Sequence, residues 1–290
     1  MTTARTIAHL GPPGTYGEEA LRDALGEQLA LETLIPVETN RDVVVAVERG
    51  EADVGFVPIE NSVEGAVTET LDALVHDAPG VMIVGEIVWP VHHCLIAANG
   101  AELGTITTIA SHPQALAQCA HFINEQLPAA TRAPKVSTAE AVRVAIENGA
   151  GWAGIGSRVA AETYDGQVLA ENVEDVTGNR TRFVWLAKQP LETGWKGTTN
   201  TEQSKTSVVF SGFNDTSPGA LVSILSEFAY RSVNLSKIES RPERTQLGHY
   251  LFFVDLDGSI DEEPIAHALD ALKGKVRELR VLGSFPTFEA

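Results

Sequence analysis

Short apolar runs rich in β-branched residues alternate with amphipathic segments through residue 188 of this 290-residue chain. The apolar runs have the length of strands, and the segments between them place apolar residues at helical spacing. Strands are predicted at residues 6–10, 54–59, 82–91, 94–98, 107–111, 151–155 and 181–186. Helices are predicted at residues 17–24, 41–49, 68–75, 113–126, 138–148 and 157–164. Strands interleaved with helices predict an α/β fold with mainly parallel sheets, whose ligands bind near the carboxyl ends of the strands.

A second pattern of predicted strands and helices begins after a stretch rich in Pro, Gly and Thr. Residues 189–204 show no periodicity and are predicted to be a linker. Residues 205–290 then predict strands at 206–212, 233–241, 250–257 and 278–285 and helices at 219–230 and 264–273. This βαββαβ order is the split-βαβ, ferredoxin-like pattern. We therefore predict two folded regions, residues 1–188 and residues 205–290.

The charge balance narrows the range of partners. The net charge is −18, from 21 basic and 39 acidic residues, and the chain contains no run of basic residues. Such a chain is a poor candidate for binding nucleic acid or an anionic membrane surface, and no apolar stretch approaches the length of a membrane span. Cys94 and Cys119 do not make a disulfide framework, which favours free thiols in a reducing cytoplasm. His92 and Cys94 would share a strand face, but no second ligand pair follows, so we predict no metal site.

Donor-rich turns join several of the predicted strands to helices. The first contains Gly11, Gly14 and Gly17, whose spacing matches neither a dinucleotide fingerprint nor a P-loop, and whose two prolines remove N–H donors. By the residues alone it is a rigid turn. Ser111 and Ser137 each precede a predicted helix, where a serine is commonly an N-cap. Together these turns are suited to holding a carboxylate through N–H and hydroxyl groups.

Four segments in one order carry a family resemblance: residues 11–16 (GPPGTY), 58–65 (PIENSVEG), 111–119 (SHPQALAQC) and 179–183 (NRTRF). Their order and spacing are similar to those of prephenate dehydratases, over nearly the whole chain. The resemblance implies a two-lobed catalytic region of the periplasmic-binding-protein type II kind, with the active cleft between its lobes. It also implies that prephenate loses CO₂ and water to give phenylpyruvate, in phenylalanine biosynthesis, without a cofactor.

The site residues that the resemblance implies come from all four segments. The implied catalytic residues are Thr181, Asn61, Ser111, Gln118 and Phe183, with Thr181 as hydrogen-bond donor to the leaving hydroxyl. The implied substrate-binding residues are Thr15, Ser62, Gly65 and Arg182.

Several roles stay open at this point. Arg182 could pair a substrate carboxylate, or the alternation of the strand could turn it away from the cleft. His112 is a general base in principle, although this elimination needs an acid more than a base. Position 17 is Gly where the family more often has Ser, and position 16 is Tyr in place of Phe. A threonine hydroxyl is a weak acid, so Thr181 either transfers a proton or only hydrogen-bonds.

The C-terminal region resembles an ACT regulatory domain, which implies that it binds L-phenylalanine as effector and pairs with another subunit in a homodimer or homotetramer. The implied effector-binding residues are Asn214, Gly219, Ala220, Leu221, Val222, Glu239, Ser240, Arg241 and Pro242. One sheet face of the region is expected to be free for that pairing, and residues 1–188 are expected to retain some catalysis alone. The alternatives are an arogenate dehydratase and a non-catalytic metabolite sensor.

Overall fold

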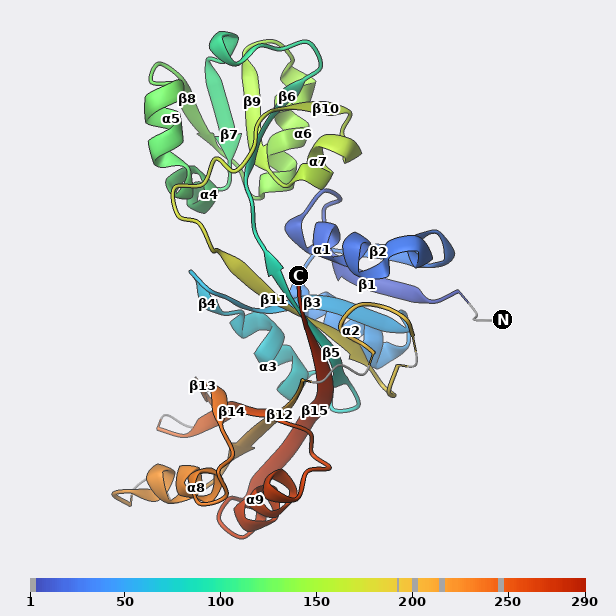
Figure 1. The fold of residues 1–290 in the computed structure, drawn as a ribbon, viewed down its shortest axis with the longest axis vertical. Helices are drawn as coiled ribbons and strands as arrows, with labels where there is room; N and C mark the ends of the chain where they lie inside the picture. Colours follow the sequence, from blue (N-terminus) through green and yellow to red (C-terminus); the bar gives the residue numbers. More distant parts are fainter. Residues whose placement is uncertain (1–3, 192, 200–202, 214–216, 245–247) are drawn as a thin grey trace.

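The chain is arranged in three tiers in the computed structural model, which describes residues 4–191, 193–199, 203–213, 217–244 and 248–290 (Figure 1). The middle tier is the first lobe, built from residues near the N-terminus and from one returning strand. The second lobe stands on one side of it and the C-terminal region on the other. No helix in these described ranges is long and apolar enough to cross a membrane.

The first lobe contains the strands that position the candidate site. They are β1 (Thr6–Leu10), β2 (Thr33–Val37), β3 (Val54–Asn61), β4 (Gly65–Ala66), β5 (Met82–Pro90) and β11 (Arg180–Ala187). Its helices are α1 (Tyr16–Leu25), η1 (Gly26–Leu31), α2 (Asn40–Arg49) and α3 (Thr68–His76). Side chains of β11 alternate between the two sheet faces, with Phe183 and Trp185 packed with α1 on one and Val184 and Leu186 in the core on the other.

The second lobe is a separate five-stranded sheet in the order β10-β6-β9-β7-β8. Its strands are β6 (Cys94–Ala98), β7 (Thr108–Ser111), β8 (Thr131–Pro134), β9 (Trp152–Gly156) and β10 (Gly166–Ala170). Its helices are η2 (Leu103–Thr105), α4 (Pro113–Gln118), α5 (Ala120–Gln126), α6 (Thr138–Asn148) and α7 (Arg158–Thr163). The chain enters this lobe after β5 and returns through β11, which confirms the two-lobed, periplasmic-binding-protein type II-like architecture.

Both lobes have mixed sheets, which corrects the expectation of mainly parallel ones. β1 runs parallel to β2 and β3, but β11 runs antiparallel to both of its neighbours, β3 and β5. β11 is the strand that brings the chain back from the second lobe, so its direction is opposite to that of β5, which leads the chain out. In the second lobe β6 is antiparallel to β9 and β10.

The C-terminal region has the predicted βαββαβ order. Its elements are β12 (Ser204–Ser211), α8 (Ala220–Ala229), β13 (Leu235–Pro242), β14 (Tyr250–Asp257), α9 (Glu263–Lys273) and β15 (Glu278–Glu289). β15 runs further than predicted: its last residues pair in parallel with β5, from Thr287 opposite Glu86 to Glu289 opposite Val88. The C-terminal sheet and the first-lobe sheet therefore form one ten-stranded sheet.

The second face of the C-terminal sheet is covered by the first lobe, contrary to the expectation of a free face. On β12 and β14, Val208 and Val254 face α8 and α9, whereas Val209 and Phe253 join the core of the first lobe. The predicted linker also packs on that lobe: Trp195 is 0% exposed, and the Lys196 carbonyl accepts a hydrogen bond from Trp185 Nε1 at 3.0 Å. The two regions thus share a hydrophobic core.

Candidate active site between the lobes

A cavity of about 400 Å³ lies where the two lobes meet. Its walls come from the turn before α1, the ends of β3 and β11, the crossing segments, and the starts of α4 and α6. Five of the nine residues expected at the catalytic and substrate-binding site line it: Thr15, Asn61, Gln118, Thr181 and Phe183. The fold brings them together although they are widely separated in the chain.

Asn61 fixes the hydroxyl of Thr181. The two residues are opposite each other on β3 and β11, and Asn61 Nδ2 donates to Thr181 Oγ1 at 2.9 Å. The orientation of the amide follows from its other side, where Oδ1 accepts from the backbone N–H groups of Val63 and Glu64 at 2.9 and 3.0 Å. Because Thr181 Oγ1 accepts from Asn61, its own proton is available to another acceptor, and no described protein group takes it up.

Asn179 completes this arrangement at the start of β11. Its Oδ1 accepts from Asn61 Nδ2 at 2.8 Å, and the carbonyl of Arg180 lies 3.2 Å from the same nitrogen. Asn179 also lines the cavity. The Asn61 amide is therefore held by partners on both strands, which leaves Thr181 little freedom to turn.

Phe183 forms an apolar wall beside this hydroxyl. It lies on the same face of β11 as Thr181, and its ring stacks on Phe56 with centroids 5.1 Å apart and an angle of 11° between the planes. The position of Gly17 brings α1 close to this wall, because a Cβ built there would lie 3.4 Å from the Phe183 ring. Glycine at position 17, where the family more often has serine, thus supplies no hydroxyl but permits close packing.

A hydrogen-bonded chain of three side chains crosses the cavity from one lobe to the other. Tyr16 of α1 donates to His93 Nδ1, and His93 Nε2 donates to Gln118 Oε1 at 2.8 Å. Burial raises the pKa of Tyr16 well above its usual value, so the phenol remains a neutral donor. The Gln118 amide NH₂ is then free of this chain and can donate into the cavity.

Sequence reasoning missed Tyr16 and His93 as site residues. The signal was present in part: His93 belongs to a run of ionisable residues at the start of β6, and Tyr16 is the family departure noted above. Their contact joins positions 77 residues apart, which no local pattern reveals.

Two helices point their N-termini at the cavity. Thr15 is the N-cap of α1, and its Oγ1 accepts from Glu18 N at 3.2 Å; Ser137 is the N-cap of α6, and its Oγ accepts from Glu140 N at 3.1 Å. Thr15, Ser137 and the first residues of both helices line the cavity. The first N–H groups of a helix lack partners inside it and carry a partial positive charge, which favours an anion. No Lys or Arg is among the described residues that line the cavity.

The remaining expected site residues lie outside the cavity wall. Ser111 is fully buried, and its Oγ donates to the Ile155 carbonyl at 2.7 Å, so its hydroxyl ties β7 to β9. Ser62 Oγ accepts from Arg180 N at 2.9 Å and supports the start of β11. Gly65 pairs with Asn61 through β4 and has a φ of 82°, which favours glycine.

Arg182 points to the face of β11 opposite the cavity, as the alternation of the strand allowed. Its guanidinium contacts Glu60, Glu86 and Asp255. Burial would lower the pKa of Arg182, but the carboxylates of Glu86 and Asp255 outweigh burial and raise it. His112 does line the cavity, where its Nδ1 accepts from Gln114 N at 3.4 Å as the cap of α4.

The expected effector residues fall into two groups. Gly219, Ala220, Leu221 and Val222 line a hollow of about 270 Å³ together with Phe213 and Phe252. Glu239, Ser240, Arg241 and Pro242 lie on β13, the last strand at one end of the large sheet. Arg241 Nη2 pairs with Asp72 of α3 at 2.8 Å. Asn214 lies outside the described residues.

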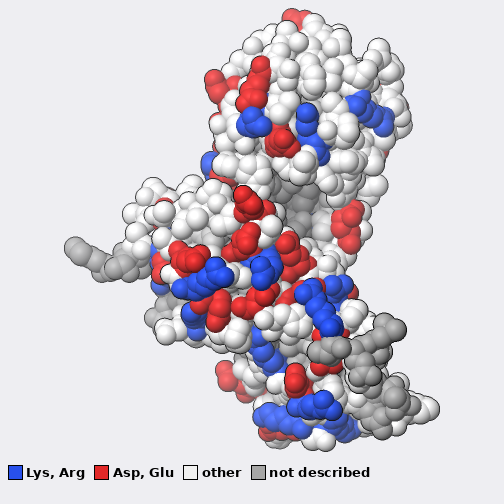
Figure 2. Space-filling model, turned by 180° about the vertical axis from the view of Figure 1, so that it is seen from behind, with Lys and Arg blue, Asp and Glu red and all other residues white. Residues whose placement is uncertain are grey.

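Charged side chains are mixed in sign on the face shown in Figure 2, where acidic and basic residues intermingle over the first lobe and the C-terminal region. Among the described residues, no group of three or more His, Cys, Asp or Glu side chains is arranged to hold a metal ion.

Comparisons with known proteins agree with this architecture. The family model described as prephenate dehydratase matches residues 7–191. A prephenate dehydratase of Amycolatopsis methanolica is 40% identical over 279 residues, covering 96% of this chain and 88% of the relative. The prephenate dehydratase of Arthrobacter aurescens, solved in complex with L-Phe, is 38% identical with a TM-score of 0.84, covering 98% of this chain and 90% of that one.

A further solved structure, of GqqA, described as a novel type of quorum quenching acylase, is 30% identical with a TM-score of 0.85 and covers 98% of both chains. In the described cavity of the present chain, no serine or cysteine hydrogen-bonds a histidine in the manner of a hydrolytic nucleophile. The family model spans more than half of the sequence, and relatives of the same description extend over nearly all of it. The chain therefore belongs to the prephenate dehydratase family.

Proposed function

We propose that the cavity between the lobes binds prephenate and converts it to phenylpyruvate, CO₂ and water. The observation that carries the proposal is the contact between Asn61 and Thr181, which leaves the Thr181 hydroxyl facing the cavity without an acceptor for its proton among the described residues. In a catalytic site this donor stabilises a leaving oxygen, and turnover distinguishes that role from simple binding.

The reaction requires one bond to break at each end of a six-membered ring. The bond to the ring carboxylate breaks, its electron pair moves into the ring, and the bond to the 4-hydroxyl oxygen breaks, so that the ring becomes aromatic. The 4-hydroxyl group departs with the electron pair of its bond to the ring, takes up a proton from solvent and becomes water. Aromatisation supplies the driving force, so the protein has to hold the substrate and stabilise the negative charge that develops on the leaving oxygen.

Thr181 is positioned to stabilise that oxygen by hydrogen bonding. The bond from Asn61 withdraws electron density from Thr181 Oγ1, which makes its O–H a better donor. Full proton transfer from a threonine would be costly, whereas a hydrogen bond that strengthens as charge develops needs no ionised alkoxide. The amide NH₂ of Gln118, oriented by His93, provides a second donor from the other lobe.

Helix N-termini supply the positive potential that binds the two carboxylates of prephenate, in place of a basic side chain. The N-termini of α1 and α6 face the cavity and offer N–H groups to anions. Phe183 and Phe56 exclude water from the other side. A carboxylate held against such an apolar wall is poorly solvated, and its charge disperses as CO₂ leaves, which favours the transition state.

The C-terminal region is proposed to sense L-phenylalanine, as an ACT domain. The hollow at Gly219–Val222 has apolar walls, Phe213 and Phe252, suited to an aromatic side chain, and it lies at the start of α8. β13 leaves one edge of the sheet without a neighbouring strand in the described chain, and Val222 of α8 and Tyr230 directly after α8 are exposed. Pairing of two chains along this edge would cover them.

We place the enzyme in the cytoplasm, where Cys94 and Cys119 stay reduced.

Turnover of prephenate and arogenate by the purified full chain tests the proposed activity. We expect phenylpyruvate to form from prephenate with the higher kcat/KM, in the presence of a chelator and without added nucleotide. A preference for arogenate, or binding without turnover, would contradict the proposal.

Calorimetry with L-phenylalanine tests the effector site separately. Gly219 has a φ of 82°, a conformation that strains valine, so Gly219→Val should weaken both L-phenylalanine binding and inhibition while leaving uninhibited kcat unchanged. Binding and inhibition equal to those of the wild type would place the effector elsewhere.

A further inference from the structure

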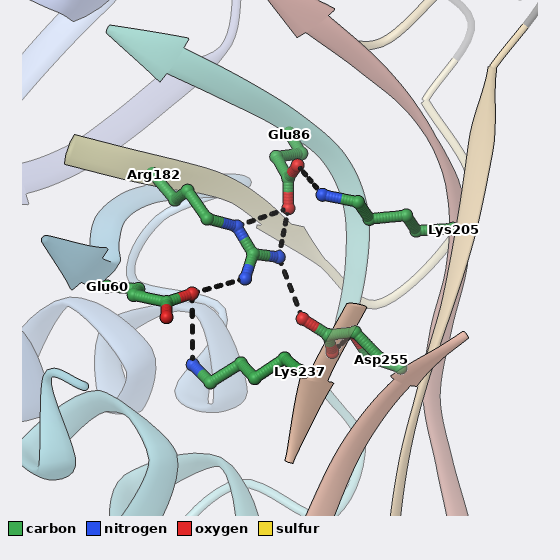
Figure 3. Close-up of polar contacts among 7 residues, drawn as sticks. Glu60, Glu86, Arg182, Lys205, Lys237 and Asp255 are labelled. Atoms are coloured by element: carbon green, nitrogen blue, oxygen red, sulfur yellow. Dashed lines mark hydrogen bonds and ion pairs between the residues drawn. The ribbon is translucent and has the colours of Figure 1, made fainter. Parts of the chain in front are cut away.

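Six charged side chains meet where the first lobe packs on the C-terminal region (Figure 3). Three are acidic and three basic: Glu60, Glu86, Asp255, Arg182, Lys205 and Lys237. We call them the interface charge cluster. Half come from the first lobe and half from strands β12, β13 and β14 of the C-terminal region.

Arg182 lies at the centre of the interface charge cluster. Its Nε donates to Glu86 Oε2 at 3.0 Å, its Nη2 contacts Glu86 and reaches Asp255 Oδ2 at 2.8 Å, and its Nη1 contacts Glu60. Glu86 is completely buried, and Ser207 Oγ holds the other oxygen of Asp255 at 2.5 Å. All three nitrogens of the guanidinium are thus engaged, which fixes its plane.

The two lysines extend the interface charge cluster to the acids of the first lobe. Lys205 Nζ pairs with Glu86 Oε1 at 2.6 Å. Lys237 has a side chain only 6% exposed, and its Nζ lies 3.6 Å from Glu60 Oε2 without a hydrogen-bond partner in the described part of the chain. A buried ammonium in this state depends on the Glu60 carboxylate, so the positions of the two are coupled.

Two of the three first-lobe members, Arg182 and Glu60, are chain neighbours of site residues, whereas the third, Glu86, lies on β5. Arg182 lies between Thr181 and Phe183, and Glu60 precedes Asn61. The pairing of β11 with β3 also shifts register between Arg182 and Phe183, directly behind the cavity. Bulges of this kind re-aim side chains near active sites. A displacement of Arg182 or Glu60 would therefore move the hydroxyl and the amide on the opposite face.

Stabilisation of the contact between the two regions does not by itself explain the interface charge cluster. Buried ion pairs contribute little net stability compared with apolar packing of similar volume, and apolar packing is available here, where Val209 and Phe253 already join the core of the first lobe. A cluster with equal numbers of acidic and basic side chains instead favours one relative position of the two regions. A displacement of either region would leave a buried charge without its partner.

We propose that Lys205, Lys237 and Asp255 of the C-terminal region are positioning residues for the dehydration site. They act through Arg182 and Glu60 on Thr181 and Asn61. The proposal rests on the dehydratase activity proposed above. The turnover of prephenate by the wild-type chain is therefore measured first. An inactive wild-type chain would contradict the proposed activity, whereas an active chain with unaffected variants would contradict the positioning role.

The test compares the kinetics of four full-length variants. Asp255→Asn and Lys237→Met each remove one charge from the interface charge cluster. Lys275→Met is the matched control, because among the described residues Lys275 pairs with Glu227 and hydrogen-bonds Ser223, both within the C-terminal region and away from the catalytic strands. We expect kcat for prephenate to fall by about tenfold in the first two, with KM within about twofold, and to stay unchanged in the control. Lys237→Arg should recover most of the loss, since the charge returns.

A second comparison separates positioning from general weakening. Asp255→Asn is repeated in a Thr181→Ala background, where no hydroxyl remains to be aimed. We expect it to lower kcat there by less than about twofold, because effects that act through one group are not additive. Wild-type kcat in both cluster variants would overturn the proposal, as would an equal tenfold loss with and without the Thr181 hydroxyl. If Asp255→Asn fails to fold, Lys237→Met combined with Asn61→Ala gives the same comparison.

Discussion

Replacement of Thr181 by alanine should separate the chemistry of the cavity from its stability. The change removes Oγ1 and one methyl group from a buried side chain, but it leaves no orphaned donor. Asn61 Nδ2 keeps the Asn179 side chain at 2.8 Å and the Arg180 carbonyl at 3.2 Å. One lost hydrogen bond and one lost buried methyl reduce the free energy of unfolding by about 1–2 kcal/mol.

The effect of Thr181→Ala on the reaction should be larger than its effect on stability. Removal of one preorganised donor to a developing oxyanion raises the activation free energy by about 2.7–4 kcal/mol, which lowers kcat on the order of 10²–10³-fold. KM should change far less, because the hydrogen bond strengthens mainly in the transition state. Steady-state kinetics of phenylpyruvate formation from prephenate give both constants.

Two further variants at position 181 identify the hydroxyl as the cause. Thr181→Val keeps the shape of the side chain without the donor and should be as slow as Thr181→Ala. Thr181→Ser keeps the donor and should be faster than either. If Thr181→Ala turned over prephenate within severalfold of the wild-type kcat, the hydroxyl would have no part in the rate-limiting chemistry and the mechanism above would be refuted.

Three other predictions follow from the same structure. Gln118→Glu keeps the acceptor for His93 but replaces the amide donor by a charge beside an anionic substrate, so kcat/KM should fall about 10²-fold; an unchanged value would exclude Gln118 from the site. Burial raises the pKa of Cys94 to about 11 and also raises that of Cys119, so at pH 8 a thiol reagent should label neither native cysteine rapidly and both after denaturation. Contrary to the expectation from sequence that residues 1–188 retain some catalysis alone, this fragment loses β15 beside β5 and the core side chains Val209, Phe253 and Phe285, so by circular dichroism and thermal melting it should lack a cooperative transition; a well-folded, active fragment would contradict the shared core.

The sequence predicted the interior of the fold better than its edges. The missed strands β2, β4, β8 and β10 all lie at sheet edges, and none of them contains a fully buried residue, so their hydrophobic pattern is weak. The predicted helix at 113–126 is interrupted at Cys119, which has φ −115° and ψ 18°. Helix and strand types were correct wherever one face is strongly apolar.

The extent of β15 was missed for a different reason. Pro286 follows the predicted strand end, and a proline normally lies at strand edges because it donates no ladder hydrogen bond. The strand nonetheless continues to Glu289, because its last residues pair with β5 of the other region. A pairing between segments 200 residues apart is a property of the tertiary fold and leaves no local signature.

The orientation of the site residues on a single strand was predictable from the sequence. The contacts between site residues of the two lobes were not. Alternation along β11 already allowed Arg182 to point away from Thr181 and Phe183, and the structure places it so. The contact of Tyr16 with His93 arises only when α1 of the first lobe meets the start of β6. Ser111 was implied by family resemblance, and its bond to the Ile155 carbonyl, which joins β7 to β9, could not be read from the sequence.

A crystal structure of the Thr181→Val variant with prephenate would test the central claim most directly, because the variant should bind substrate but turn it over slowly. We expect the 4-hydroxyl oxygen of prephenate to contact the side chain at position 181 and the Gln118 amide, with the ring against Phe183. A 4-hydroxyl directed away from position 181, or prephenate bound outside the cavity between the lobes, would contradict the account.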